Sequence, residues 1–201
     1  MKVIGLMGGV GAGKSTVAGM LRELGAGVHD ADHAVHETWR EAEVKEAAVR
    51  LLGDGILKPD GEVDRAAVAE RVFPDPAKLK ALEGLLHPRV RLRMEAWLAD
   101  ERARGAKAAV LDVPLLMEAG LDGLCNLLLF VEAPESLRET RAAGARGWAA
   151  GETARRQALQ GDLAAKRAKA HAVISNAGDL ADTRRQTQVF WKQHIQGGQD
   201  R

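Results

Sequence analysis

Short apolar runs recur along the chain at the lengths of strands that are buried on both faces of a sheet. The runs lie at residues 3–7, 108–113, 126–131 and 172–174, with a briefer one at 25–30. Between most of them, apolar residues recur at helical spacing, as at Val17, Leu21 and Leu24. Strands that alternate with helices predict an α/β fold, here a doubly wound, five-stranded parallel sheet with helices on both faces.

A long stretch without a strand signal, residues 33–105, separates the second run from the third. Its apolar residues follow helical spacing, so it predicts a helical insertion. The dipeptide His87-Pro88 interrupts this pattern, and proline disfavours helical geometry in the residue that precedes it. We therefore expect His87 to be extended at a junction between two helices, the second of which runs from Pro88 to about Arg104.

Residues 138–171 differ from the rest of the chain because they are basic and poor in large apolar side chains. One interpretation is an exposed helical hairpin with solvated charges. The other is a basic lid that folds over phosphate groups and excludes water. A last helix, from about Asp179 to Ile195, is expected to bury Leu180, Val189 and Trp191.

The charge balance is nearly even, with 29 basic and 28 acidic residues and a formal net charge of +1. Such a chain has no net field to attract nucleic acid or an anionic membrane, and aromatic residues at 3% offer few platforms for base stacking. The single cysteine, Cys125, excludes an internal disulfide and suits a reducing cytosol. No apolar run reaches the roughly 18 residues of a membrane span, and the first strand begins too early for a signal peptide. We expect a cytoplasmic protein.

The segment between the first strand and the first helix reads Gly8-Gly9-Val10-Gly11-Ala12-Gly13-Lys14-Ser15. It fits G-x-x-x-x-G-K-[ST], the phosphate-binding loop of P-loop proteins, in the required strand–helix context. Its glycines allow the positive φ angles that turn several N–H groups towards one polyphosphate. Lys14 then suits the β- and γ-phosphates, and the Ser15 hydroxyl suits Mg²⁺. A chance match in a glycine-rich turn is the alternative, but the flanking elements favour binding of a nucleoside triphosphate.

Carboxylates follow two of the predicted strands. Asp30 and Asp32 come at the end of the second strand, and Asp112 comes at the end of the third. Open α/β sheets bind ligands at this edge, and a P-loop protein holds the water shell of its Mg²⁺ there with an acidic residue. Aspartate is also a favoured helix N-cap, so spacing alone leaves both interpretations open.

These features favour a small-molecule kinase over a motor or a switch GTPase. We expect a single P-loop kinase domain, residues 1–201, that acts as a monomer or weak homo-oligomer. Its parts are a core at about 1–32, 106–137 and 172–196, a helical substrate lobe at about 33–105, and the lid at about 138–171.

Further motifs accompany the loop in order along nearly the whole chain. They include Asp30-Ala31-Asp32, Gly61-Glu62-Val63-Asp64-Arg65, Leu86-His87-Pro88, Pro114-Leu115-Leu116-Met117-Glu118, and Val173-Ile174-Ser175-Asn176-Ala177-Gly178. Together with the loop they resemble the motifs of the dephospho-CoA kinases. Enzymes of that family transfer the γ-phosphate of ATP to the ribose 3′-hydroxyl of dephospho-CoA, the last step of coenzyme A synthesis. The resemblance implies ATP and dephospho-CoA as substrates and Mg²⁺ as the cofactor.

The resemblance also implies roles for individual residues. The ATP-binding residues would be Gly11, Ala12, Gly13, Lys14, Ser15, Thr16 and Asn176, with Ser15 also a metal ligand. Asp32 would act as the base beside the acceptor hydroxyl, while Arg65 and His87 would line the dephospho-CoA side. Lys14 and the lid residues Arg141 and Arg146 would offset charge on the transferred phosphoryl group.

Three departures from the family pattern accompany the resemblance. Met117 stands where an aromatic residue is usual, and His171 stands where an aspartate is usual, which a histidine cannot copy as an anion. The spacing from Arg141 to Arg146 is one residue longer than usual. It is therefore open whether Arg138 or Arg141 faces the phosphates.

Three alternative functions remain at this level. A P-loop kinase for another nucleoside or small metabolite would share the scaffold, although the long insertion suits a bulky acceptor. A nucleotide switch is disfavoured because neither D-x-x-G nor N-K-x-D occurs in the sequence. An inactive P-loop regulator is disfavoured by the intact Lys14, Ser15 and Asp32.

Overall fold

The computed structural model describes residues 1–146, 157–158 and 160–197. The chain forms two compact units. The first comprises Met1–His29 and Asp100–Arg201 and contains the sheet, whereas the second comprises Asp30–Ala99 and is largely helical.

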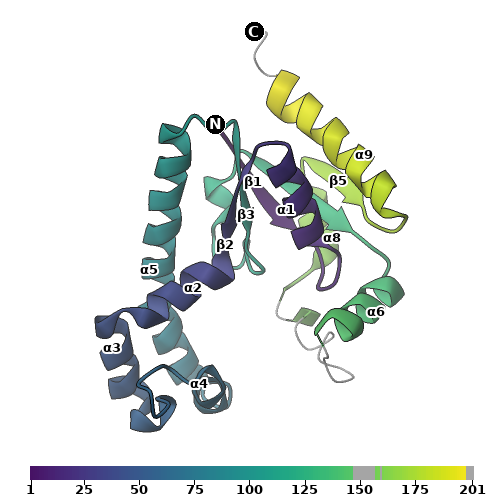
Figure 1. Ribbon diagram of the computed structural model, residues 1–201. Coiled ribbons are helices and arrows are strands. Elements are labelled where there is room, and N and C mark those ends of the chain that lie inside the picture. Colours follow the sequence, from purple (N-terminus) through teal and green to yellow (C-terminus); the bar gives the residue numbers. More distant parts are fainter. Residues whose placement is uncertain (147–156, 159, 198–201) are drawn as a thin grey trace. The chain divides into compact units, whose positions relative to one another are not determined.

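The five predicted strands form one sheet (Figure 1), which confirms the predicted fold class. They are β1 (Lys2–Met7), β2 (Gly27–Asp30), β3 (Ala108–Asp112), β4 (Leu127–Glu132) and β5 (Ala172–Ser175), in the spatial order β2-β3-β1-β4-β5. Ile4 of β1 lies opposite Val110 of β3 and Leu127 of β4, and both pairings are parallel, as is that of β4 with β5. β1 is therefore the central strand, and it is apolar because both of its faces are covered.

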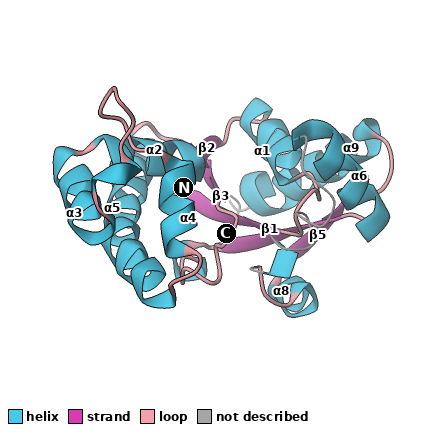
Figure 2. Ribbon diagram, turned by 90° about the horizontal axis from the view of Figure 1, so that it is seen from below, coloured by secondary structure: helices cyan, strands magenta, loops and turns pink. Residues whose placement is uncertain are grey.

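Helices of the first unit cover both faces of the sheet (Figure 2). They are α1 (Lys14–Glu23), α6 (Glu135–Arg146), α8 (Leu163–Lys169) and α9 (Leu180–Trp191), with a short continuation at Lys192–Gln196 and a 3₁₀ turn at Asp122–Leu124. α1 and α9 lie on one face and α8 lies on the other. Leu6, Leu21, Leu129 and Trp191 are at most 2% exposed and belong to one apolar core, so burial of these side chains holds the helices on the sheet.

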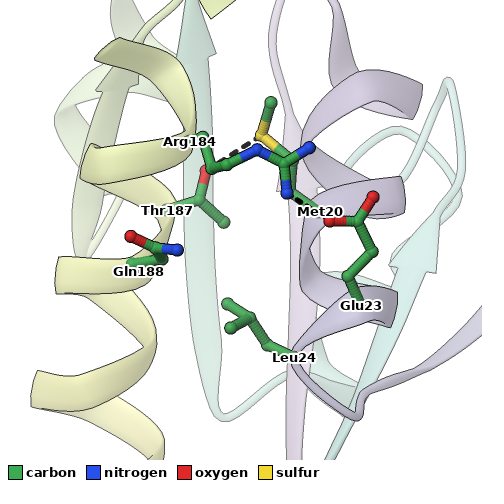
Figure 3. A pocket seen from close by; sticks show the side chains of 6 residues that line it. All are labelled: Met20, Glu23, Leu24, Arg184, Thr187 and Gln188. Carbon is green, nitrogen blue, oxygen red and sulfur yellow. Dashed lines mark hydrogen bonds and ion pairs between the residues drawn. The ribbon is translucent and has the colours of Figure 1, made fainter. Parts of the chain in front are cut away.

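The buried face of α9 differs from the prediction. Leu180 and Val189 are 56% and 49% exposed, so only Trp191 of the three expected residues is buried. Thr183 and Thr187 are fully buried in their place, because each hydroxyl donates to the carbonyl four residues earlier and so loses no hydrogen bond. Figure 3 shows Thr187 facing Met20 of α1.

The second unit is built from a contiguous helical stretch. It contains α2 (Ala31–Arg40), α3 (Ala42–Leu52), a 3₁₀ turn (Asp54–Ile56), α4 (Arg65–Val72) and most of α5 (Pro76–Ala103). Val44, Ala48 and Ile56 are completely buried in a core of its own that also includes Trp39 and Leu82. The predicted helical character of the insertion is confirmed.

The expected break at His87-Pro88 is wrong, because α5 is a single helix of 28 residues with Pro88 inside it. Pro88 cannot donate to the carbonyl of Gly84, four residues earlier, but both residues are exposed, so that carbonyl is not left in the interior. Leu82 on one side of the proline and Met94 and Leu98 on the other are buried, and this packing favours continuation of the helix. Despite the length of α5, none of the helices in the described part of the chain is both long and apolar enough to cross a membrane.

Candidate active site

The loop after β1 has the backbone geometry of a phosphate cradle. Gly8, Gly11 and Gly13 have φ angles of 142°, 77° and 91°, which side chains rarely permit. A Cβ on Gly8 would strike the backbone of Val131, and one on Gly13 would strike the amide of Asn176. No side chain in the described part of the chain caps the N-terminus of α1, so the first-turn N–H groups and the positive end of the helix dipole suit an anion.

Lys14 is held over this loop. Its ammonium donates to the carbonyl oxygens of Gly8 and Gly9, at 2.9 and 3.2 Å. These contacts place a positive charge above the glycine backbone before any ligand binds. Ser15 and Thr16 follow in the first turn of α1, and both are exposed.

A hydroxyl and a carboxylate meet beside the loop. Ser15 Oγ donates to Asp112 Oδ2 at 3.2 Å. The contact follows from the topology, since β1 and β3 are adjacent parallel strands whose carboxyl ends share one edge. Oxygen donors of these two kinds are what Mg²⁺ prefers, so the residues present fit the predicted magnesium site.

Asn176, predicted to contact ATP, braces the loop from the end of β5. Asn176 is 5% exposed; its Nδ2 donates to the carbonyl of Ala12 at 2.8 Å, and its Oδ1 accepts from Thr183 at 3.0 Å. Arg141 in turn donates from Nη1 to the backbone carbonyl of Asn176 at 3.0 Å. Sequence reasoning missed this bracing role, because a hydrogen bond across 164 positions leaves no local pattern.

The two arginines that the sequence left open have different surroundings. Arg138 Nη1 lies 2.8 Å from Gln157 Oε1 and 3.4 Å from the carbonyl of Val10, in the middle of the loop. Arg141 instead lies against Asn176, as described above. Arg146 ends α6, but its side chain is outside the described part of the structure.

The residues predicted to contact the acceptor substrate belong to the second unit. Asp32 is the second residue of α2, directly after β2, and its side chain is outside the described groups. Asp30 is the last residue of β2, whereas Asp32 lies in the first turn of α2. Arg65 opens α4 behind the N-cap Asp64 and is exposed. His87 is exposed on α5, and neither it nor Arg65 makes an ion pair within the described residues.

The segment after β3 is tied to α8 by contacts that the sequence did not indicate. Lys166 Nζ lies 2.7 Å from Glu118 Oε1, with the lysine side chain 9% exposed and the glutamate side chain 30%. Gln160, which is 4% exposed, donates to the carbonyl of Pro114 at 3.3 Å. Among the basic residues of 138–171, Lys166 is thus a buried partner rather than a solvated charge.

His171 has a structural role that explains one departure from the family pattern. Its Nδ1 accepts a hydrogen bond from the backbone N–H of Leu128 at 3.0 Å, and the backbone N–H of His171 donates to the carbonyl of Leu128 at 2.8 Å. The position therefore needs an acceptor rather than an anion. A neutral imidazole with its proton on Nε2 supplies one.

Cys125 is not a candidate nucleophile. Burial, with a smaller contribution from the charge of Asp122, raises the pKa of its thiol to about 12. The thiol is therefore neutral and unreactive near pH 7. The sulfur of Cys125 packs against Gly5, and a Cβ added to Gly5 would come within 2.8 Å of that sulfur.

Comparison with known proteins gives a consistent result. The family model described as dephospho-CoA kinase matches residues 2–182. The dephospho-CoA kinase of Symbiobacterium thermophilum is 39% identical over 193 residues, which cover 96% of this chain and 81% of that protein. That of Geobacillus kaustophilus is 40% identical over 194 residues, covering 94% and 95%.

Solved structures agree with this match. A crystal structure from Thermus thermophilus superposes with a TM-score of 0.81 at 36% identity, covering 96% of this chain and 97% of that one. The dephospho-CoA kinase of Campylobacter jejuni shares the fold, with a TM-score of 0.74 at 22% identity. The match covers 97% of this chain and 98% of that one. A shikimate kinase of Acinetobacter baumannii shares the fold more distantly, with a TM-score of 0.53 at 16% identity. That match covers 100% of this chain and 96% of the shikimate kinase. With a family model that spans most of its length and relatives near 40% identity, the chain belongs to the dephospho-CoA kinase family.

Proposed function

We propose that the protein transfers the γ-phosphate of ATP to the ribose 3′-hydroxyl of dephospho-CoA, giving coenzyme A and ADP. The observation that carries this proposal is the loop at Gly8–Ser15, with Lys14 above its backbone and the Ser15–Asp112 pair beside it. Membership of the family narrows the acceptor from any hydroxyl to dephospho-CoA.

On the donor side, the loop amides and the N-terminus of α1 bind the triphosphate, and Lys14 reaches its outer phosphates. Ser15 and Asp112 would hold Mg²⁺, which would offset the negative charge of the phosphates. Asn176 keeps the loop in shape through Ala12. Thr16 and the glycines from Gly11 to Gly13 complete the ATP site.

On the acceptor side, Asp32 accepts the proton of the 3′-hydroxyl as that oxygen attacks the γ-phosphorus. Arg65 and His87 bind the acceptor, and their exposure on the second unit is compatible with that role. Arg141 and Arg146 offset charge on the phosphates. Phosphoryl transfer has a loose transition state, so positioning and charge stabilisation contribute more than the base does.

The proposal is tested with purified protein, ATP, Mg²⁺ and dephospho-CoA. We expect ADP release and a product whose mass corresponds to coenzyme A, with activity lost on chelation by EDTA and restored by Mg²⁺. Uridine and gluconate serve as control acceptors. Phosphorylation of either of these, without phosphorylation of dephospho-CoA, would assign the protein to another small-molecule kinase activity.

The role of Asp32 is tested with Asp32→Asn, which keeps the shape of the side chain but not its basicity. We expect kcat to fall by about 10²–10⁴-fold, the range for loss of a general base, with little change in ATP affinity. An unchanged kcat would exclude the role.

We further propose that the protein works in the cytoplasm as a monomer or weak homo-oligomer, without nucleic-acid or membrane partners. Its nearly even charge, +1 overall, supports this because it gives no general attraction to polyanions. Light scattering across a concentration series would measure the assembly state.

A further inference from the structure

The middle of the phosphate loop is held by two side chains from outside the loop motif. One is Arg138, whose contact with the phosphates the sequence left open, and the other is Gln157, which the sequence did not indicate. Gln157 Oε1 accepts from the backbone N–H of Val10 at 3.1 Å and from Arg138 Nη1 at 2.8 Å. The same Nη1 lies 3.4 Å from the carbonyl of Val10. We call these two side chains the Arg138–Gln157 bracket.

The bracket lies directly against the loop backbone. A Cβ on Gly9 would come within 2.9 Å of Gln157 Oε1 and would strike the Arg138 guanidinium, and a Cβ on Gly11 would strike the backbone of Arg138. Glycine at these two positions therefore serves the close approach of the bracket as well as the curvature of the loop. The loop and the bracket fit each other as one packed unit.

The orientation of the Gln157 amide is fixed by its neighbours. Two N–H donors converge on Oε1, so that atom must be the oxygen. The opposite atom, Nε2, is buried and has no hydrogen-bond acceptor among the described residues.

The bracket has a rigid support behind it. The backbone N–H of Gln160 donates to the carbonyl of Gln157 at 3.0 Å, and the Gln160 side chain donates to Pro114 after β3. Gln160 is 4% exposed, so this contact of Gln157 is with a buried residue. Gln157 is thus linked through Gln160 to the segment after β3 as well as to the loop.

We propose that Arg138 and Gln157 are positioning residues that keep the loop shaped for the phosphates of the bound nucleotide. Among the described residues, the Arg138 side chain donates to the loop and to Gln157, so we infer that it acts through the loop. The loop is pre-organised at Val10, because the backbone N–H of Val10 donates to Gln157 and its carbonyl accepts from Arg138. Binding then avoids the cost of ordering that peptide segment.

The test compares nucleotide affinity with turnover. Gln157→Met removes the hydrogen-bond acceptor at similar side-chain volume and leaves the charge of Arg138 in place. We expect the Kd for Mg-ADP and the KM for ATP each to rise about tenfold, the effect of losing one buried hydrogen bond. kcat at saturating ATP should stay within about twofold, because the loop holds ground state and transition state alike. Gln157→Glu retains an acceptor for both donors and should recover most of the lost affinity.

Further variants separate this role from a direct contact and from misfolding. Arg138→Ala should weaken Mg-ADP binding by a similar factor, and the double variant with Gln157→Met should be no weaker than the more affected single one, since both changes break one unit. Glu139→Ala, at an exposed neighbour on α6, is the matched control and should bind like the parent. Melting temperatures within a few degrees of the parent would show that all variants fold.

Three results would overturn the proposal: unchanged Mg-ADP affinity in Gln157→Met, a fall in kcat with unchanged Mg-ADP affinity in Arg138→Ala, or additive effects in the double variant. The second would identify Arg138 as a direct contact of the transferred phosphoryl group. The inference relies on the proposed function only for nucleotide binding. Mg-ADP affinity would report on the bracket even if dephospho-CoA were not the acceptor.

Discussion

Replacing Glu118 with glutamine should destabilise the protein by leaving the Lys166 ammonium without a counter-charge. The lysine side chain is 9% exposed and its partner 30%. Breaking a fully buried ion pair costs about 3–5 kcal/mol, whereas an exposed pair contributes less than about 1 kcal/mol. Glutamine keeps an oxygen that can accept from the ammonium, so we expect an intermediate loss of about 2 kcal/mol. For a chain of this size, that corresponds to a fall of about 4–8 °C in Tm.

The unequal exposure of the two partners gives this prediction a second, sharper part. Lys166→Met removes the buried charge and leaves a carboxylate that water can reach, so it should cost only about 1 kcal/mol or less. The double variant should be no less stable than Lys166→Met alone, because no buried charge remains. Urea unfolding of the three variants measures these differences. Equal costs for the two single variants, or simple additivity in the double one, would refute the reasoning.

His171→Leu should lower the free energy of unfolding by about 1–3 kcal/mol, because the backbone N–H of Leu128 loses its acceptor. His171→Asp keeps an acceptor at this position and should lose less. Urea unfolding of both variants measures the difference, and equal losses would contradict the acceptor role. Burial, and then the positive charge of Lys2, lower the pKa of His194 below its ordinary value of 6.5. The unfolded chain therefore binds the proton more tightly, so stability should be complete above about pH 6.5 and decline as the pH falls through and below that value. Unfolding measured from pH 8 to 5 should show a flatter profile for His194→Gln, and an identical slope would contradict this assignment.

The sheet and the phosphate loop could be predicted from sequence because their signals are local. A parallel strand buried on both faces is continuously apolar, and a loop that needs several positive φ angles has few alternatives to glycine. The Ser15–Asp112 pair was foreseeable for the same reason, since an acidic residue at the end of a strand next to β1 must lie close to the loop.

Tertiary contacts decided the features that were missed. Pro88 predicts a break when considered alone, but packing on both sides of it continues the helix. The charge of Lys166 and the amide of Gln157 give no sequence signal, because each is defined by a partner far away in the chain. The threonines of α9 look polar in the sequence, and only their bonds to preceding carbonyls make burial possible.

The central place of β1 has a consequence for the order in which the chain can fold during synthesis. β1 is made first, yet its partners around Val110 and Leu127 emerge only about a hundred residues later, roughly 5–20 s at ordinary rates of translation. The contacts of the second unit lie within one contiguous stretch, Asp30–Ala99, and are all available before then. An apolar strand therefore leaves the ribosome early and must stay unpaired while the helical unit is completed. The phosphate loop, which depends on that strand, takes its final form only when the second half of the chain has arrived.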